Sequence, residues 1–299
     1  MKKEHFQTKQ EYDLVIHWKI TDFCNFSCPG CSGQTKKAGR KYIPEKIDIS
    51  AFKKILAGLD RTIKILFTGG EPLLIENIIE VFEEVTSENY MALITNLTNP
   101  KVKVLSERIN PERVEFIKAS AHLLELEKRQ LLDTFLDHYN MLQDKGFHIY
   151  TEEVAYPVMA DKVEKYKKIF FDRGIELKFQ AYRGLWQEKQ YPEAYTKKEY
   201  SIFNFSDIGA ATTAIHNRKD KKCNAGYNVV VGFHDGRICR CYGIPDYMGN
   251  LFTGFKLDDT LISCPLDYCD CPLSLFDPHL FEMAIEETKS PILMKEQNF

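Results

Sequence analysis

Three cysteines near the start of the chain have a spacing suited to metal binding. Cys24, Cys28 and Cys31 directly follow a strand-like run, Leu14–Ile20. In parallel β/α folds, active sites form at the carboxyl ends of such strands. Three thiolates can hold a [4Fe–4S] cluster by three of its irons and leave the fourth iron open to another ligand. A zinc site completed by a nearby histidine is the alternative for this group of thiols.

The remaining cysteines form a second group near the end of the chain. The alternating run Val229–Phe233 and the turn at 234–236 predict a β-hairpin that brings Cys223 and Cys241 together. The six thiols of this group can ligate one four-iron cluster, whereas two such clusters would need about eight. A structural zinc site is the alternative for the whole module. The expected ligands are four of the following five residues, Cys264 being the competitor: Cys223, Cys241, Cys269, Cys271 and Cys264. Cys239 is expected to be a free thiol, and its functional alternatives are hydrogen-atom donation or a place as an alternative cluster ligand.

Short β-rich runs alternate with helical patterns through the first 182 residues, which is typical of parallel β/α units. The six expected strands are Leu14–Ile20, Ile63–Thr68, Met91–Thr95, Val114–Ser120, His148–Ala155 and Glu176–Ala181. Apolar residues recur at helical spacing in four stretches between them, Phe52–Leu59, Leu74–Val85, Leu132–Tyr139 and Val163–Phe170. Ser50 is a candidate N-cap for the first helix, and Gly146 and Gly174 are expected to stop the last two. The sequence predicts an α/β fold.

Composition excludes several classes of protein. The chain has 299 residues, of which 44% are hydrophobic, so it can bury a large core. Its net charge of −3 gives no overall positive field that would attract nucleic acid or anionic membranes. No apolar run is long enough for a membrane span, and the charged N-terminal stretch is unlike a signal peptide, so we expect a cytoplasmic protein. Walker and GxGxxG phosphate loops are also absent from the sequence.

A second motif, Gly69-Gly70-Glu71-Pro72, follows the second expected strand. Glycines there permit close approach of the backbone, and a carboxylate can accept a hydrogen bond from an ammonium group. CxxxCxxC followed by GGE on the next strand resembles the radical S-adenosylmethionine (SAM) superfamily. The resemblance implies a partial (β/α)6 barrel, a SAM-binding [4Fe–4S] cluster on Cys24, Cys28 and Cys31, and SAM contacts from the GGEP residues.

The resemblance extends to weaker features. It implies SAM contacts from Asn96, after the third strand, and from Ser120, at the end of the fourth. Gly30 departs from the family, which usually has an aromatic residue near the adenine at this position, so we expect that contact from elsewhere, with Phe26 as a candidate.

The C-terminal cysteines resemble the auxiliary-cluster domains called SPASM and twitch. Twelve residues separate Cys223 from Gly236 and four more lead to Cys241, as in the opening of those domains. The closing cysteines are fewer than in a full SPASM domain. The resemblance implies one auxiliary [4Fe–4S] cluster. We therefore expect a barrel over 1–182, a connection over 183–222 and an auxiliary module over 223–299, with a closing helix at 278–288.

The resemblance implies that SAM is cleaved reductively to a 5′-deoxyadenosyl radical, which abstracts hydrogen from a substrate. We expect a peptide substrate, because the module is typical of such relatives and the connection is rich in aromatic and charged residues. The alternative is oxidation of a small alcohol or of a side chain to formylglycine, since only thirteen residues precede the first strand and a leader-binding domain is not evident. A flavodoxin- or ferredoxin-type donor is implied. Cys239, Glu152 and His122 are the catalytic candidates, and Glu153 and Arg183 also lie near strand ends.

Overall fold

A curved parallel sheet forms the centre of the molecule. The computed structural model describes residues 11–31, 46–205, 219–267 and 269. The parallel strands follow one another in chain order as neighbours across the sheet. Their bounds are β1 Leu14–Thr21, β2 Ile63–Gly69, β3 Tyr90–Thr95, β4 Val114–Ser120, β5 Ile149–Ala155 and β6 Leu177–Ala181. All six expected strands and the partial barrel are confirmed.

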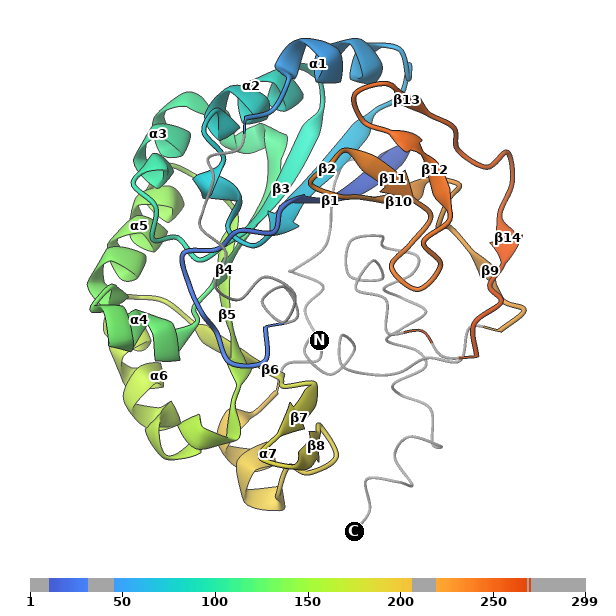
Figure 1. Ribbon diagram of the computed structural model, residues 1–299. Helices are drawn as coiled ribbons and strands as arrows, with labels where there is room; N and C mark the ends of the chain where they lie inside the picture. The colour runs from blue at the N-terminus through green and yellow to red at the C-terminus, as the bar shows by residue number, and fades with distance from the viewer. Residues whose placement is uncertain (1–10, 32–45, 206–218, 268, 270–299) are drawn as a thin grey trace.

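Helices cover the outer face of this sheet (Figure 1). They are α1 Ile49–Ala57, α2 Ile78–Glu88, α3 Lys101–Arg108, α4 Leu123–Arg129, α5 Leu132–Asp144 and α6 Val163–Phe171. Short 3-10 turns precede some of the helices or strands: η2 Pro72–Leu74, η3 Pro111–Arg113 and η4 Pro157–Lys162. The N-cap of α1 is Asp48 rather than Ser50, because the Asp48 side chain accepts a hydrogen bond from the amide of Ala51 at 3.0 Å.

Side-chain alternation along the strands separates a core from a barrel interior. In β1, Leu14, Ile16 and Trp18 point to the helices and join the main hydrophobic core. The residues between them face inward, where Val15 packs with Val229 and Val231 in a separate cluster. This division leaves the inner face free for polar side chains near the carboxyl ends of the strands.

The C-terminal part of the chain extends the same sheet. Four strands continue it beyond β1: β10 Val229–Gly232, β11 Arg237–Cys239, β12 Tyr247–Asn250 and β13 Gly254–Phe255. β10 pairs with β1 in parallel, and the Trp18 indole N–H donates to the carbonyl of Phe233 at 3.0 Å. The predicted hairpin at 229–239 is present as β10 and β11. Two short strands, β9 Lys222–Cys223 and β14 Ile262–Ser263, pair with each other separately.

The connection after β6 is more regular than its composition indicated. It contains a hairpin of β7 Gly184–Trp186 and β8 Lys189–Tyr191, followed by α7 Lys197–Phe203. The two turn residues, Gln187 and Glu188, both have positive φ, of 47° and 63°. Asn and Gly are the usual residues in such turns, so the sequence carried no hairpin signal. The expected closing helix at 278–288 lies outside the described residues.

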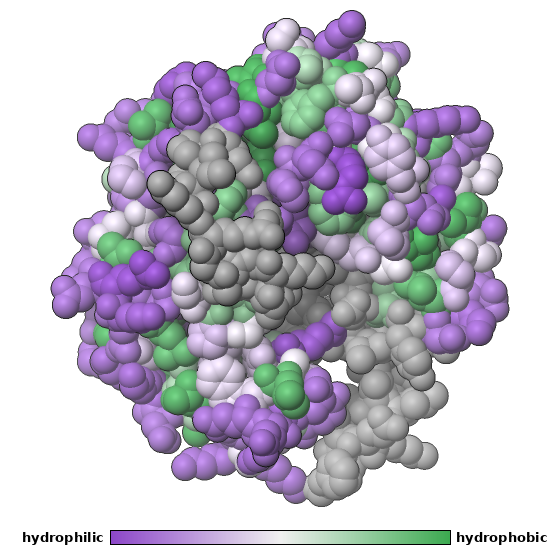
Figure 2. All heavy atoms as spheres, in the orientation of Figure 1, coloured by the Kyte–Doolittle hydropathy of each residue, from purple (hydrophilic) through white to green (hydrophobic). Residues whose placement is uncertain are grey.

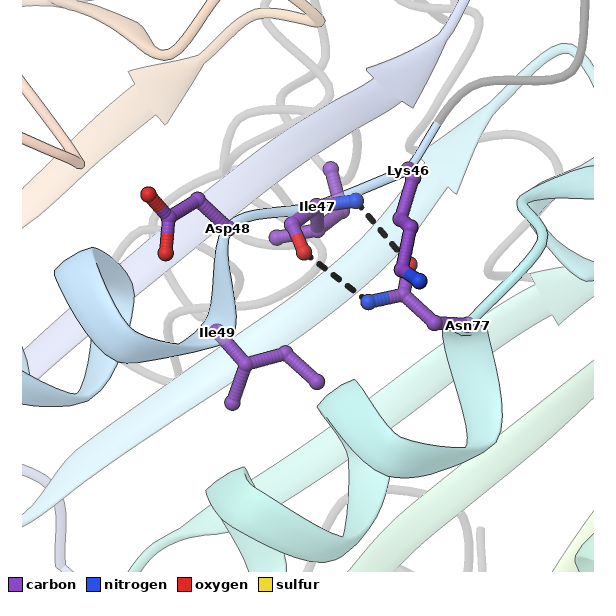
Figure 3. A pocket seen from close by; sticks show the side chains of 5 residues that line it. All are labelled: Lys46, Ile47, Asp48, Ile49 and Asn77. Carbon is purple, nitrogen blue, oxygen red and sulfur yellow. Dashed lines mark hydrogen bonds between the residues drawn. The ribbon is translucent and has the colours of Figure 1, made fainter.

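A hollow lies beside the amino ends of α1 and α2 (Figure 3). The Asn77 amide donates to the carbonyl of Ile47 and accepts from its N–H, each at 2.9 Å. The other lining residues are Lys46, Asp48 and Ile49. None of the five belongs to the cysteine or glycine motifs. The two hydrogen bonds of Asn77 hold the segment before α1 against the start of α2.

The visible surface is mostly hydrophilic. Figure 2 shows charged and polar residues over much of the helical side of this face, with apolar residues in small separate patches. Within the described ranges, no helix combines the length and apolar character needed to cross a membrane.

Candidate functional site

The first cysteine loop crosses the carboxyl ends of the parallel strands. Cys24, Cys28 and Cys31 are half-buried on it. Burial raises the pKa of the Cys24 thiol to about 12, with a smaller contribution from Cys31. Burial, followed by the neighbouring Cys24 and Cys31, also raises the pKa of Cys28. The three thiols therefore lie close enough to influence one another, and a ligand that needs thiolates must displace protons from them.

Two glycines bring the end of β2 directly against this loop. Gly69 has a φ of +130°, and a Cβ there would overlap the backbone of Thr21. A Cβ at Gly70 would overlap the carbonyl of Phe23 and come within 3.0 Å of the Cys24 amide nitrogen. The amide of Gly70 donates to the carbonyl of Thr21 at 2.7 Å. Only glycine permits this approach, so the motif fixes the position of the first cysteine.

Glu71 is buried and accepts hydrogen bonds from the protein itself. Its carboxylate accepts from the Thr95 hydroxyl at 2.7 Å, the Asn96 amide at 2.8 Å and the Leu73 amide at 3.1 Å. Its own amide donates to the carbonyl of Phe23 at 2.7 Å. Burial raises the pKa of Glu71 to about 7, although these hydrogen bonds oppose the rise. Pro72, the first residue of η2, is also buried. Through its hydrogen bonds to Thr95, Asn96 and Phe23, Glu71 joins the ends of β2 and β3 to the cysteine loop.

Asn96 ties the end of β3 to the same loop. Its amide nitrogen donates to the Asn25 side-chain oxygen at 2.8 Å, and its side-chain oxygen accepts from the Thr98 hydroxyl at 2.7 Å. The Asn25 amide nitrogen in turn donates to the Thr98 oxygen at 3.0 Å. Sequence reasoning missed Asn25 and Thr98, which carry no motif of their own.

The middle of the loop rests on α4. The amide of Ser27 donates to the Glu125 carboxylate at 3.1 Å, and Arg129 donates to the same oxygen at 2.8 Å. The Phe26 ring is 1% exposed, with Arg129 over its face and His122 6.1 Å away in an edge-to-face contact. This burial leaves no free ring face for the adenine contact expected of Phe26. The anchoring Glu125 is acidic and follows the β4 end, so the strand-end rule could have found it.

The next strand ends carry Ser120, an expected SAM contact, and the catalytic candidates Glu152 and His122. Ser120, at the end of β4, is half-buried and lies opposite Glu152 of β5. Glu152 is buried and forms an ion pair with Lys118 inside the barrel. His122 is half-buried, and burial followed by the charge of Lys118 lowers its pKa to about 4. The imidazole is therefore neutral near pH 7.

Glu153 points away from the barrel interior. Its side chain accepts a hydrogen bond from the amide of Leu123, at the start of α4, at 2.6 Å. Because it alternates with Glu152 along β5, it faces the helices, and burial raises its pKa to about 8. Its charge also contributes to the raised pKa of Cys28, so this carboxyl lies near the cysteine loop.

The last part of the loop contacts the ends of β5 and β6. The Tyr156 hydroxyl donates to the carbonyl of Pro29. Tyr182, directly after β6, places its ring against Gly30, which has a φ of +66°. The sequence analysis missed both tyrosines, although each immediately follows a predicted strand.

Three C-terminal thiols lie near one another. Burial raises the pKa of Cys241 to about 11, and Cys223 and Cys269 contribute to the rise. Cys241 also packs with Cys223 in the inner hydrophobic cluster. Cys264 is buried, and its backbone forms an isolated β-bridge with Lys219. Cys271 lies outside the described residues. Within the described ranges, no three or more His, Cys, Asp or Glu side chains, those of the first cysteine loop included, are placed to hold a single metal ion.

Cys239 has different surroundings. It lies on β11 opposite Val231 and is buried. Burial raises its pKa, and the charge of Arg237 opposes the rise; within the described part of the chain, no other cysteine contributes to this shift. This environment separates Cys239 from the group around Cys241.

The comparisons with known proteins agree with this site. A model of the radical SAM superfamily matches residues 18–168, just over half of the 299 residues. That range contains the cysteine loop, the glycine motif and the strand ends that hold them. The chain belongs to the radical SAM superfamily and is a radical SAM enzyme.

Individual relatives are distant. Uncharacterized protein MJ0907 of Methanocaldococcus jannaschii is 40% identical over 72 residues, which are 24% of each chain. The solved structure of native anSMEcpe with bound AdoMet has a TM-score of 0.56 at 17% identity, covering 81% of this chain and 79% of that one. SuiB of Streptococcus suis has a TM-score of 0.52 at 15% identity, covering 84% and 67%. These likenesses show a shared fold.

The family implies a [4Fe–4S] cluster and SAM, and the residues present fit the cluster. Cys24, Cys28 and Cys31 share one loop, their thiols influence one another electrostatically, and the backbone around them is fixed by Gly70 and Glu71. These three cysteines are the residues that would hold the cluster.

Proposed function

We propose that this enzyme modifies a peptide by radical SAM chemistry and carries one auxiliary [4Fe–4S] cluster. The observation that carries the proposal is the shared fold over about four fifths of the chain. The neighbours include anSMEcpe solved with the Cp18Cys peptide, at a TM-score of 0.54, and SuiB solved with its precursor peptide SuiA, at 0.51. Those two structures contain a bound peptide, and we propose peptide binding for this protein as well.

The chain contributes position and shielding to the reaction. When bound, the cluster and SAM supply a 5′-deoxyadenosyl radical that abstracts hydrogen from the substrate. Gly69, Gly70, Glu71 and Pro72 fix the loop that holds the cluster, and we propose that this edge, with Asn96 and Ser120, also binds SAM. The buried Glu71 carboxylate keeps an acceptor position for that role, because a carboxylate offers about four such positions and the protein uses three. Reduced flavodoxin or ferredoxin is proposed as the electron source.

The auxiliary cluster is proposed at the C-terminal thiols. Cys223, Cys241 and Cys269 are the described ligands, with Cys271 as the fourth and Cys264 as its competitor. The contributions of Cys223 and Cys269 to the raised pKa of Cys241 support this set. An auxiliary cluster there could accept the electron that a substrate radical loses on oxidation to the product, or it could bind part of the substrate.

Iron content tests the cofactor part of the proposal. After anaerobic reconstitution, the wild-type chain is expected to hold about eight irons and a variant with Cys24, Cys28 and Cys31 changed to Ala about four. That variant should release no 5′-deoxyadenosine. Cys239→Ser is the matched control, since its thiol lies apart from both groups, and it should keep all the iron. About four irons in the wild type, falling to none in the triple variant, would contradict the auxiliary cluster.

Peptide modification is tested with a precursor peptide encoded beside the gene. The reduced enzyme with SAM should convert it to a product that mass spectrometry detects as loss of hydrogen, or as deuterium uptake from heavy water. SAM cleavage without a change in the peptide would contradict the peptide assignment while leaving the family intact. Turnover of a small alcohol under the same conditions would favour the alternative substrate class.

A further inference from the structure

We infer that Tyr182 is a positioning residue for the iron–sulfur cluster: its ring fills the side-chain space at position 30 and holds the turn between Cys28 and Cys31. Tyr182 stands immediately after β6, at the opposite edge of the parallel strands from β1, which leads into the cysteine loop. The inference rests on the family's cluster and goes beyond the peptide substrate and the auxiliary cluster.

The contact between Tyr182 and Gly30 is direct. A Cβ placed on Gly30 would lie 2.6 Å from Cε2 and 2.8 Å from Cζ of the Tyr182 ring. Real Cβ atoms do not approach other atoms so closely, so the ring occupies the volume of the missing side chain. The φ of +66° at Gly30 further favours glycine. The residue pair is therefore complementary, with a small residue on the loop and a large one on the barrel.

Tyr182 is itself held firmly. Its side chain is 5% exposed, its amide donates to the Tyr195 hydroxyl at 2.8 Å, and its own hydroxyl donates to the carbonyl of Leu185 at 3.2 Å. Tyr195 also donates to the carbonyl of Ala155, at the end of β5. The ring is thus fixed to the barrel and to the β7–β8 hairpin before any cluster is present.

Neighbouring aromatic rings complete a wall along the turn. Tyr182 lies 5.2 Å from Tyr156 and 6.0 Å from Trp186, measured between ring centroids. Tyr156 donates to the carbonyl of Pro29, so the wall holds two successive residues between Cys28 and Cys31. Removing the Tyr182 ring would release Gly30 while Pro29 stays bound. We therefore expect a loosened ligand turn in an otherwise folded barrel.

Cluster retention in the reconstituted protein is the test. Supporting residues around metal ligands typically change metal affinity by about tenfold or more when they are removed. Tyr182→Ala should therefore release the iron of the SAM cluster to a chelator about tenfold faster than wild type, with a changed electron paramagnetic resonance spectrum of the reduced cluster. Tyr182→Phe keeps the ring and should behave as wild type. Tyr191→Ala removes a neighbouring ring that packs on Tyr182 and Tyr195, with centroids 6.1 and 4.7 Å away, and it should leave iron release unchanged.

A double-mutant cycle separates positioning from general stability. Gly30→Ala alone should speed iron release, because its Cβ meets the Tyr182 ring. In the Tyr182→Ala background, Gly30→Ala should speed iron release much less, because the ring that its Cβ would meet is gone. The backbone strain at position 30 is the same in both backgrounds and cancels when the two effects are compared. Tyr182→Leu replaces the alanine variant if that one does not fold. Equal effects of Gly30→Ala in both backgrounds, or wild-type iron release in Tyr182→Ala, would overturn the inference, as would a lowered unfolding midpoint with an unchanged cluster spectrum.

Discussion

The two cysteine regions are held by different means. Cys24, Cys28 and Cys31 lie on an irregular loop that side chains and backbone from β2 to β6 anchor to a large core. Cys223 and Cys241 lie at the ends of short strands, in a cluster of few buried residues beside the barrel's inner face. The first region is shaped by the barrel before a cofactor arrives. The second has less packing to shape it, so we expect it to depend more on its metal.

The largest effect is expected at Gly70, where the barrel meets the first loop. Gly70→Ala places a Cβ on the backbone of Phe23, which cannot move without moving Cys24. Overpacking of this kind costs about 3 kcal/mol, and the variant should lose the SAM cluster and 5′-deoxyadenosine formation. Urea unfolding and iron counting measure both effects.

Gly58→Ala is the matched control for that change. Like Gly70, Gly58 does not have a positive φ, but a Cβ there would lie at an ordinary contact distance, 3.5 Å, from the carbonyls of Lys54 and Ile55. The control should change the stability by no more than about 1 kcal/mol and keep the cluster. Equal losses in the two variants would mean that contact with the loop does not explain the Gly70 effect.

Metal removal should separate the two regions next most strongly. After a chelator strips both clusters, limited proteolysis should cut the part around β9 and β14 at least about tenfold faster, while the barrel resists as before. The β10–β11 hairpin should also resist, because Val230 and Ile238 belong to the main core. Unchanged cleavage around β9 and β14 would show that this region folds without metal.

A smaller effect is expected at Arg240, which stiffens the second region. Its guanidinium donates to the carbonyl of Ala225 at 3.1 Å and pairs with Asp258 in a partly buried site. Arg240→Met should cost about 2 kcal/mol and lower the urea concentration at which the auxiliary iron is lost. The exposed pair of Arg237 and Asp235 supplies the control, because Arg237→Met should cost less than about 1 kcal/mol. Loss of iron from the SAM cluster instead would contradict the separation.

The sequence was informative where chemistry and periodicity coincide. Strand ends placed Cys24 and Gly70 at one edge of the sheet, and the structure confirms that adjacency. The partners of the loop were harder to find because they pair across long stretches of chain. Tyr156 and Tyr182 are ordinary aromatic residues in sequence, and only the curvature of the sheet brings them to Pro29 and Gly30. The sequence could not show whether the Glu71 carboxylate contacts a ligand or the protein, because either use requires a polar acceptor at this position. In the structure it accepts three hydrogen bonds from the protein.

The helix N-terminus beside the first loop gives the most specific prediction. Burial raises the pKa of Glu153 to about 8, above the ordinary value of about 4.3. The folded protein therefore keeps a proton that the unfolded chain loses. This contribution to stability is complete below about pH 4 and is lost as pH rises to about 8. Glu153→Gln keeps an acceptor for the Leu123 amide and removes the titration.

The stability of Glu153→Gln relative to wild type should accordingly increase from about pH 5 to about pH 8 and then level off. Burial lowers the pKa of His17 to about 3 and that of His122 to about 4. The contribution of these histidines to the stability of the protein is therefore lost as pH falls, which is opposite in sense to the effect of Glu153. They are present in both proteins, so subtracting the two urea midpoints at each pH isolates Glu153. Glu112→Gln, at an exposed carboxyl, should give a flat difference. A flat difference for Glu153→Gln as well would mean that this carboxyl is ionised beside the loop.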